Sequence, residues 1–383
     1  MEVENFGLHD KVEINGREFH IHTGTMVENR RILCEVFEKG MFLISREYSL
    51  DLRSEVQKIN YEFLNRVTQT FHQDVIEELK ALYTIESKLD RFRHPRSHYY
   101  LGFLFLRRNL YSEAIRQFKN ALRHDSSYLK AYMGLGISYL KNHQYDEAVT
   151  SFEKALSLNS KYPDLLNYFG LSYVFKGNYD RAMTLFKEAI SMNPNYVECQ
   201  FNLGVALYKS ALDGVKEPRE VAVPARVSIY LKQVRDLEKY RTARWQQDFN
   251  QLLDLLKDNN HDIIMPQLEE FQLRLVDFVA DKEKIFEFYL RFLFAGKEFD
   301  LETIDKYERY FNNKSNQNTN YPDFWNDLGT FNLVKSRAFY LKSIAEFEKA
   351  LELAPNFDEA KENLNKIKGH EKGFLILLRA ILR

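Results

Sequence analysis

The chain has 383 residues, 45% of them hydrophobic and 14% aromatic, so it can bury a large core and hold two or three domains. Its 54 Lys and Arg residues are matched by 55 Asp and Glu residues, and a net charge of -1 leaves no excess positive field to hold nucleic acid. Two cysteines, Cys34 and Cys199, exclude a disulfide framework and a cysteine-based metal cluster. The amino terminus lacks the features of a secretory signal, and no run of about 18 apolar residues occurs, so we predict a cytoplasmic location.

Residues 11–45 have the pattern of two β-hairpins. In the first, two alternating runs flank Asn15-Gly16, the pair preferred in a type I′ turn because both of its central positions need positive φ. In the second, two further runs flank a turn that contains Lys39-Gly40. We predict a four-stranded antiparallel meander, which is too small to be stable with a bare face and therefore needs a cover.

A long helix is predicted to supply that cover. From Leu52 to Leu82, apolar residues recur in steps of three and four, which defines one stripe of a helix. One end of this helix can lie on the sheet while the other leads into the next segment.

Two histidine pairs have a spacing that can ligate a metal. His20 and His22 share one face of a predicted strand, but no third ligand type clusters near them in the sequence. His94 and His98 are separated by Pro95, which is expected to open a helix, so they do not share a helical face. We predict a solvated or half-buried polar face at the first pair and no metal site at either.

Four glycines mark an internal repeat in the centre of the chain. Gly102, Gly136, Gly170 and Gly204 stand 34 residues apart. Small and large residues recur at fixed offsets around the first three, namely Leu101, Phe105, Ala114, Phe118 and Ala121, then Tyr132, Leu135, Tyr139, Ala148, Phe152 and Ala155, then Leu166, Phe169, Tyr173, Ala182, Phe186, Ala189 and Pro194.

This register resembles the tetratricopeptide repeat, a helix pair with a 34-residue period and the pattern W-x2-L-G-x2-Y, A-x3-F and P. Small residues at the eighth and twentieth places let helices A and B of one repeat approach closely, while the large residues fill the space between neighbouring pairs. The resemblance implies a superhelical array of helix pairs that binds other proteins.

The register breaks after Gly204. Helix A of a fourth repeat begins at Val197, but no second helix follows on schedule, and residues 213–225 contain the Gly and Pro residues of a loop. The following segment is helical by periodicity without repeating, with helices predicted over 227–258, 266–280, 282–294 and 301–311 and a polar loop over 312–320.

The repeat pattern returns near Pro322, with two extra residues between its helices. The residues that fit it are Trp325, Leu328, Gly329, Ser343, Phe347, Ala350 and Pro355. A capping helix is predicted over 357–367, followed by an apolar segment, 373–383, that packs on the last repeat or binds a partner or a membrane.

The resemblance also assigns a binding surface, because in this family helix A of each repeat lines the concave groove. The implied groove residues are Arg96, Tyr99, Tyr100, Phe103, Leu106, Arg107, Lys130, Met133, Ile137, Leu140, Lys141, Asn167, Tyr168, Leu171, Phe175, Phe201, Asn202, Val205 and Tyr208. Members that bind chaperone tails have Lys and Asn where this chain has Tyr99 and Phe103, so such a tail is not the expected ligand.

The groove so defined is apolar with aromatic walls, which suits an amphipathic helix. That helix comes either from a partner protein or from this chain, through the segment 227–312 or the tail. Walker A, GxGxxG, GxSxG and zinc-spaced Cys pairs are lacking, so we predict no enzymatic activity and no cofactor.

The predicted architecture is mostly α-helical, a tetratricopeptide-type superhelix interrupted by a helical insertion and preceded by a small β meander packed on a long helix. The predicted segments are 1–50 for the β module, 51–94 for the connecting helix, 95–210 for the repeats, 211–320 for the insertion, and 321–383 for the last repeat, cap and tail.

The leading functional hypothesis is a non-enzymatic scaffold or adaptor that binds a helical or extended peptide. The Phe-, Tyr-, Lys- and Asn-rich composition suits a bacterial protein, and a place in a bacterial motility or envelope assembly is a hypothesis in keeping with it. Two alternatives are a sensor whose β module binds a small ligand or GTPase, and a membrane-peripheral protein that uses residues 373–383. The sequence does not indicate an oligomeric state.

Overall fold

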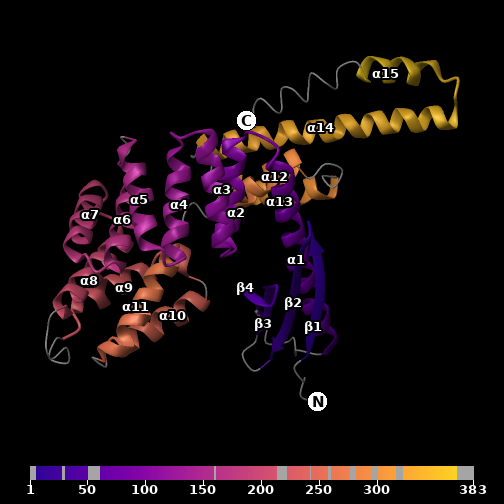
Figure 1. The fold of residues 1–383 in the computed structure, drawn as a ribbon. Helices are drawn as coiled ribbons and strands as arrows, with labels where there is room; N and C mark the ends of the chain where they lie inside the picture. Colours follow the sequence, from indigo (N-terminus) through magenta and orange to yellow (C-terminus); the bar gives the residue numbers. More distant parts are fainter. Residues whose placement is uncertain are drawn as a thin grey trace. The chain divides into compact units, whose positions relative to one another are not determined.

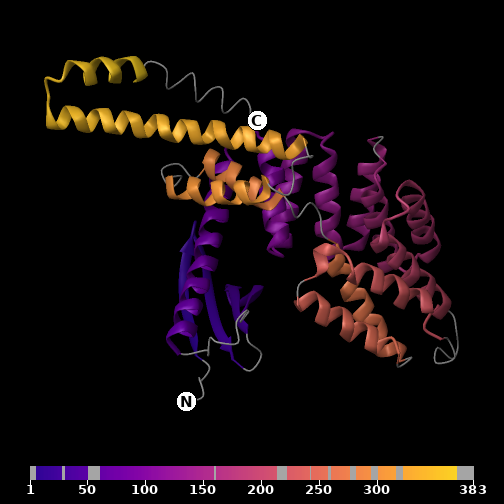
Figure 2. The same cartoon turned by 180° about the vertical axis from the view of Figure 1, so that it is seen from behind.

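The computed structural model describes residues 6–27, 31–50, 61–158, 161–213, 222–241, 243–257, 260–276, 282–294, 301–315 and 322–368 (Figures 1 and 2). The chain divides into two compact units. Unit 1 joins Met1–Leu110 to Asp281–Arg383, and unit 2 is Tyr111–Ala280. The predicted repeat segment 95–210 therefore contributes to both units, as does the predicted insertion 211–320.

Unit 1 begins with the predicted four-stranded antiparallel meander. The strands, in the order β1-β2-β3-β4, are β1 Gly7–Ile14, β2 Arg17–Met26, β3 Arg31–Glu38 and β4 Met41–Ser49. Both tight turns have two consecutive positive φ angles, 53° and 76° at Asn15 and Gly16, and 51° and 77° at Lys39 and Gly40. These values match the backbone that a type I′ turn requires, so the sequence-based turns are confirmed.

One face of the sheet is covered by α1 Tyr61–Leu89, the helix predicted from residue 52 onward (Figure 1). Phe19 and Ile21 on β2 are fully buried, and the Phe19 ring stacks on Tyr83 of α1 with a centroid distance of 5.1 Å. The side chain of Asn15, in the first turn, donates a hydrogen bond of 2.7 Å to the carbonyl of Tyr83. The opposite face of the sheet carries polar and aromatic side chains.

The repeat helices form as the 34-residue register predicts. They are α2 Pro95–Arg107 in unit 1, and α3 Tyr111–His124, α4 Leu129–Lys141, α5 Tyr145–Ser157, α6 Pro163–Phe175, α7 Tyr179–Met192 and α8 Val197–Leu212 in unit 2. A Cβ added to Gly170 would lie 2.6 Å from the Phe186 ring, and one added to Gly136 would lie 2.6 Å from Phe152. These glycines therefore allow the close approach of helices A and B.

The turn between helices A and B has a positive φ at one register position. Asn109, His143 and Gly177, each 34 residues from the next, have φ angles of 61°, 58° and 75°. Asn, His and Gly are the residue types that tolerate this conformation best. The register places Ala211 at the same position of the fourth repeat, and α8 continues through it to Leu212.

The insertion folds onto the fourth repeat in unit 2. It contains α9 Ala225–Arg235, the short 3-10 helix η2 Glu238–Tyr240, α10 Ala243–Leu255 and α11 His261–Leu275. The single predicted helix over 227–258 is wrong, because η2 interrupts it. The predicted start at Pro266 is also wrong, since the helix begins at His261 and holds Pro266 in its second turn.

Unit 1 is completed by four further helices, α12 Glu283–Phe294, α13 Leu301–Ser315, α14 Pro322–Leu353 and α15 Asp358–Lys368. Helix α12 packs against α2, and α15 runs back along α14 (Figure 2). Helix α14 is continuous over 32 residues, so the predicted helix pair after Pro322 is not formed. Ser336 stands where the earlier repeats have a positive φ, and it offers no preference for a turn. The tail 373–383 lies outside the described residues.

Candidate functional site

The predicted groove residues of the first repeat are covered within unit 1 by α12. The Tyr100 ring stacks on Phe286 at 4.2 Å, and the Phe103 ring meets the same residue edge-on at 5.1 Å. Arg107 pairs with Glu283 at 3.3 Å, also on α12. Of the other predicted residues, Tyr99 and Leu106 are buried and Arg96 is exposed. This part of the groove is therefore occupied by the chain itself.

The apolar groove residues of the fourth repeat are covered within unit 2 by the insertion. Phe201, Val205 and Tyr208 are fully buried in one hydrophobic cluster with residues of α9, α10 and α11. The Tyr208 hydroxyl also forms a hydrogen bond with Nδ1 of His261 on α11. Among the remaining predicted residues, Met133, Ile137 and Leu140 are buried, Lys141 and Phe175 are half-buried, and Lys130 is exposed.

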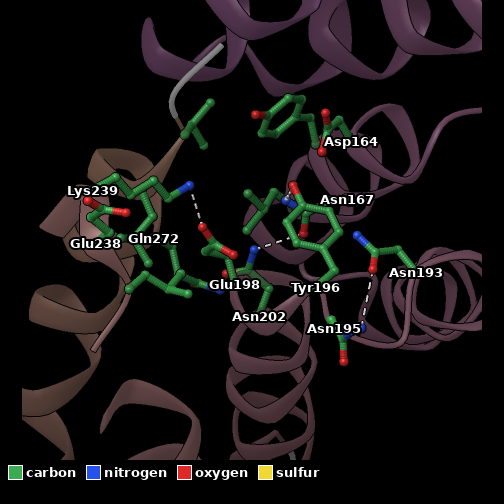
Figure 3. Close-up of a pocket in the computed structure, with 15 residues that line it drawn as sticks. Asp164, Asn167, Asn193, Asn195, Tyr196, Glu198, Asn202, Glu238, Lys239 and Gln272 are labelled. Atoms are coloured by element: carbon green, nitrogen blue, oxygen red, sulfur yellow. Dashed lines mark hydrogen bonds and ion pairs between the residues drawn. The ribbon is translucent and has the colours of Figure 1, made fainter. Parts of the chain in front are cut away.

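A pocket of about 650 Å³ remains open in unit 2, between the third and fourth repeats and the insertion (Figure 3). Four predicted groove residues line it: Asn167, Tyr168, Leu171 and Asn202. Its other lining residues come from the α7–α8 turn, from α8, from the segment around η2 and from α11. Asn167 and Asn202 thus line a pocket, although only 2% of each residue is exposed, whereas the insertion covers the apolar groove residues of the fourth repeat.

Three carboxamides form a hydrogen-bonded relay in this pocket, which we call the amide pocket. Nε2 of Gln272 donates to Oδ1 of Asn202 at 3.0 Å, and Nδ2 of Asn202 donates to Oδ1 of Asn167 at 2.9 Å. Nδ2 of Asn167 donates in turn to the Tyr196 hydroxyl at 3.1 Å. The relay joins three helices and fixes the orientation of each amide.

The ends of the relay differ in their hydrogen bonding. Oε1 of Gln272 is buried and has no hydrogen-bond partner among the described residues. At the other end, burial raises the pKa of Tyr196 well above its ordinary value, and the nearby Tyr168 and Asp164 raise it further. The Tyr196 hydroxyl therefore stays protonated near neutral pH and can donate a hydrogen bond to Asp164. The unpaired amide oxygen is an acceptor available to a ligand.

One ion pair crosses the pocket between the fourth repeat and the insertion. Nζ of Lys239 lies 2.5 Å from Oε1 of Glu198, whose side chain is largely buried, and Figure 3 shows the two side chains meeting. The lining therefore combines amides, one charge of each sign and the apolar side chains of Leu171 and Leu275.

Comparison with known protein families assigns the repeats. The family model described as tetratricopeptide repeat matches residues 129–162, and a second model described as TPR repeat matches residues 170–210. The first range holds α4 and α5, and the second holds the second half of α6, all of α7 and most of α8. The chain therefore contains tetratricopeptide repeats within residues 129–210. Proteins of this family serve as protein–protein interaction scaffolds, and that is the kind of function that the repeats support.

Several solved structures are similar to parts of the chain. MamA is 19% identical with a TM-score of 0.34, covering 46% of this chain and 94% of its own. YrrB, described as a TPR protein with an unusual peptide-binding site, is 21% identical with a TM-score of 0.32 and covers 50% of this chain and 97% of its own. PilF of Pseudomonas aeruginosa is 19% identical with a TM-score of 0.34 and covers 60% and 95%. At these TM-scores the likeness supports no functional conclusion.

The search of curated proteins gave no match. Among the described helices of the chain, none combines the length and the apolar character that crossing a membrane requires.

The sequence did not identify three side chains that complete the amide pocket: Tyr196, Lys239 and Gln272. Tyr196 immediately precedes α8, at a position outside those implied by the family. Lys239 and Gln272 belong to the insertion, which has no repeat register. Gln272 is a fully buried polar residue on a helix whose other buried side chains are mostly apolar. A polar residue on an apolar helical stripe is therefore the one sequence signal that could have found it.

Replacing Asn202 by alanine is expected to lower the free energy of unfolding of unit 2 by about 1–2 kcal/mol, because Asn167 and Gln272 each lose a partner while water in the pocket restores part of the loss. Urea unfolding followed by fluorescence measures the change. Asn120→Ala is the matched control, since its side chain accepts an exposed hydrogen bond from Arg123. Equal effects of the two substitutions would show that the relay does not stabilise the unit.

Proposed function

We propose that this protein is a non-enzymatic scaffold that binds a short extended segment of a partner protein in the amide pocket. The proposal depends chiefly on one observation, the buried and unpartnered Oε1 of Gln272 at the end of an oriented amide relay. An unpaired buried acceptor costs free energy unless a ligand or a water molecule satisfies it.

The chemistry of the pocket complements a peptide backbone. A carboxamide carries both a donor and an acceptor, as a peptide group does, so aligned amides can pair with successive backbone groups of an extended chain. Leu171 and Leu275 offer apolar contact for a side chain of the same segment. The volume of about 650 Å³ falls within the range of about 300–1,000 Å³ that is typical of ligand sites.

An extended segment suits the accessible surface better than an amphipathic helix. A helix needs an apolar groove for anchors at i, i+3 and i+7, and the apolar residues Phe201, Val205 and Tyr208 lie under the insertion. An external helix is also not expected at α2, because Phe286 of α12 already packs on its groove-facing aromatic residues, Tyr100 and Phe103.

The lining also favours binding over catalysis. Its titratable side chains are Tyr168, Tyr196, Asp164, the exposed Glu238 and the ion pair of Glu198 with Lys239. Burial keeps Tyr196 protonated, and Asp164 is hydrogen-bonded to it. Acid–base or nucleophilic catalysis requires a titratable group near neutral pH or a nucleophile beside a base. The described lining of the pocket contains no His, Cys, Ser or Thr side chain to take these roles.

Peptide display with the full chain tests the proposal. A library of unstructured 12-residue peptides would be selected on the wild-type protein, and the affinities of the selected peptides would be measured for Asn195→Trp and Lys187→Trp. Asn195 is an exposed residue of the pocket lining, and Lys187 is an exposed residue of α7 outside it. We expect Asn195→Trp to weaken binding at least tenfold and Lys187→Trp to leave it unchanged.

A second measurement distinguishes extended from helical ligands. A proline placed at the centre of a selected peptide breaks a helix but is tolerated by an extended chain that does not use that N–H. Retained affinity for several proline positions is the expected result. Selected peptides that bind Asn195→Trp and the wild type equally would place their site elsewhere and refute the proposal.

A further inference from the structure

Three histidines gather on the face of the sheet that α1 does not cover. One nitrogen from each of His9, His20 and His22 lies within 4.8 Å of the others. The His9 and His22 rings meet edge-on at 4.3 Å, and those of His9 and His20 stack at 5.7 Å. The sequence indicates only the pair on β2 and no third ligand near it, whereas the fold brings His9 of β1 beside that pair.

The hairpin register causes this arrangement. The two-residue Asn15-Gly16 turn pairs Ile14 with Arg17, and continuing the ladder places His9 directly opposite His22. His20 is two residues from His22 on the same strand and therefore faces the same side. The three rings thus project from two adjacent strands that are fixed by eight backbone pairings.

A carboxylate already orients one of the rings. Oε1 of Glu18 lies 3.0 Å from Nε2 of His20. An ionised carboxylate can only accept, so Nε2 of a neutral His20 carries the proton and its Nδ1 keeps a free lone pair. A carboxylate that fixes the tautomer of a histidine ligand is common beside protein-bound metals.

The charges around the cluster are balanced. Lys11, on the same face, would repel a cation, but its ammonium pairs with Glu18 at 2.7 Å. Glu35 stands opposite His22 on β3 and is half-buried on that face. A water molecule can complete a four-coordinate site.

We propose that His9, His20 and His22 form a binding site for a divalent transition-metal ion of the zinc type, with Glu18 as a positioning residue. Imidazole nitrogens suit zinc, copper and nickel better than magnesium or calcium, which prefer oxygen. Tetrahedral coordination at about 2.0–2.1 Å brings ligand nitrogens to within about 3.4 Å of one another, so the rings close by rotating about their side-chain bonds. His9 and His22 are exposed, which leaves them free to do so.

Calorimetric titration of the tag-free full chain with ZnCl2, after removal of metal by a chelator, tests the site. We expect one equivalent to bind with micromolar or tighter affinity. His9→Gln and His22→Gln should each weaken binding at least tenfold, and Glu18→Gln should weaken it about tenfold, as losses around a metal ligand commonly do. Glu18→Asp, which keeps the carboxylate, should restore part of the affinity.

His124→Gln is the matched control, because it removes an exposed histidine of unit 2 and should leave the titration unchanged. Circular dichroism of each metal-free variant confirms that the sheet is folded, and the exposed position of these strand residues makes glutamine easy to accommodate. Binding of less than one equivalent by the wild type, or equal affinity in the His9→Gln/His22→Gln double variant, would overturn the proposal.

Discussion

Replacing Arg108 by methionine is expected to lower the free energy of unfolding of unit 1 by about 3 kcal/mol at neutral pH. The guanidinium is only 4% exposed, and its Nη2 and Nη1 lie 2.5 Å from Glu78 and 2.7 Å from Glu283. The contact with Glu283 is an ion pair without hydrogen-bond geometry at Nη1. Methionine keeps much of the volume but leaves two carboxylates without their shared cation, and removal of one partner of a buried ion pair commonly costs about 3–5 kcal/mol.

The difference in free energy of unfolding between Arg108→Met and the wild type should become smaller in acid. Burial alone would raise the pKa of Glu287, but Lys284, Arg291 and Arg108 together hold it below its ordinary value of 4.5. A lowered pKa in the folded state contributes stability above pH 4.5 that is lost as the pH falls further. Without Arg108 the pKa of Glu287 in the folded state rises toward its ordinary value. The variant therefore loses less stability than the wild type as the pH falls. Below pH 4.5 its free energy of unfolding approaches that of the wild type.

Urea unfolding in a Trp245→Phe background measures both effects, because Trp325 is then the sole tryptophan and lies in unit 1. The neighbouring Arg107→Met is the control. Its guanidinium is 33% exposed and pairs with the same Glu283 at 3.3 Å, so at most about 1 kcal/mol should be lost. Equal losses for the two arginines would contradict the argument from burial.

Replacing Gly170 by alanine is expected to destabilise unit 2 by about 2–3 kcal/mol. The added Cβ would lie 2.6 Å from Cε1 and 2.9 Å from Cδ1 of Phe186, distances that real Cβ atoms do not reach. The Phe186 ring is fully buried, so it can move only by displacing its neighbours. Overpacking of this kind typically costs about 1–3 kcal/mol, which outweighs the better helix propensity of alanine.

The same substitution at Gly204 should have the opposite sign. Gly204 holds the same place in the 34-residue register, but a Cβ there would lie 3.5 Å from Tyr230, an ordinary contact. The gain in helix propensity, about 0.5–1 kcal/mol, then remains. Urea unfolding of both variants in a Trp325→Phe background, where Trp245 reports on unit 2, distinguishes the two cases. A loss of stability at both glycines would mean that the insertion packs as tightly as a second repeat helix.

The contrast between Gly170 and Gly204 shows how far the repeat register predicts the fold. The glycine spacing located every helix from α2 to α8, because the helix–helix contacts within a repeat join residues close in sequence. The register did not predict that α14 is one helix. The signal was present at Ser336, where the earlier repeats have Asn109, His143 and Gly177 at a positive φ.

The same register defined the predicted binding surface. Some of the predicted residues are covered by other parts of the chain, and others line a pocket. The family pattern indicates which side chains of each helix A face the groove, but it does not indicate what covers them. Phe201 and Val205 are covered by the insertion, whereas Asn167 and Asn202 line an open pocket. Apolar periodicity is the same for a groove that awaits a partner and for one already filled by the chain, because either neighbour buries the same stripe.

The sequence by itself determined the features that depend on local chemistry. Asn15-Gly16 specifies the first hairpin turn because both residues accept positive φ, and the 34-residue pattern specifies the helix pairs. Only the tertiary structure decided which distant groups meet. Gln272 reaches Asn202 from 70 positions away, and Arg108 lies between α1 and α12. Such contacts depend on how helices that lack a repeat register pack together. The local sequence does not indicate which distant residue a buried polar group will contact.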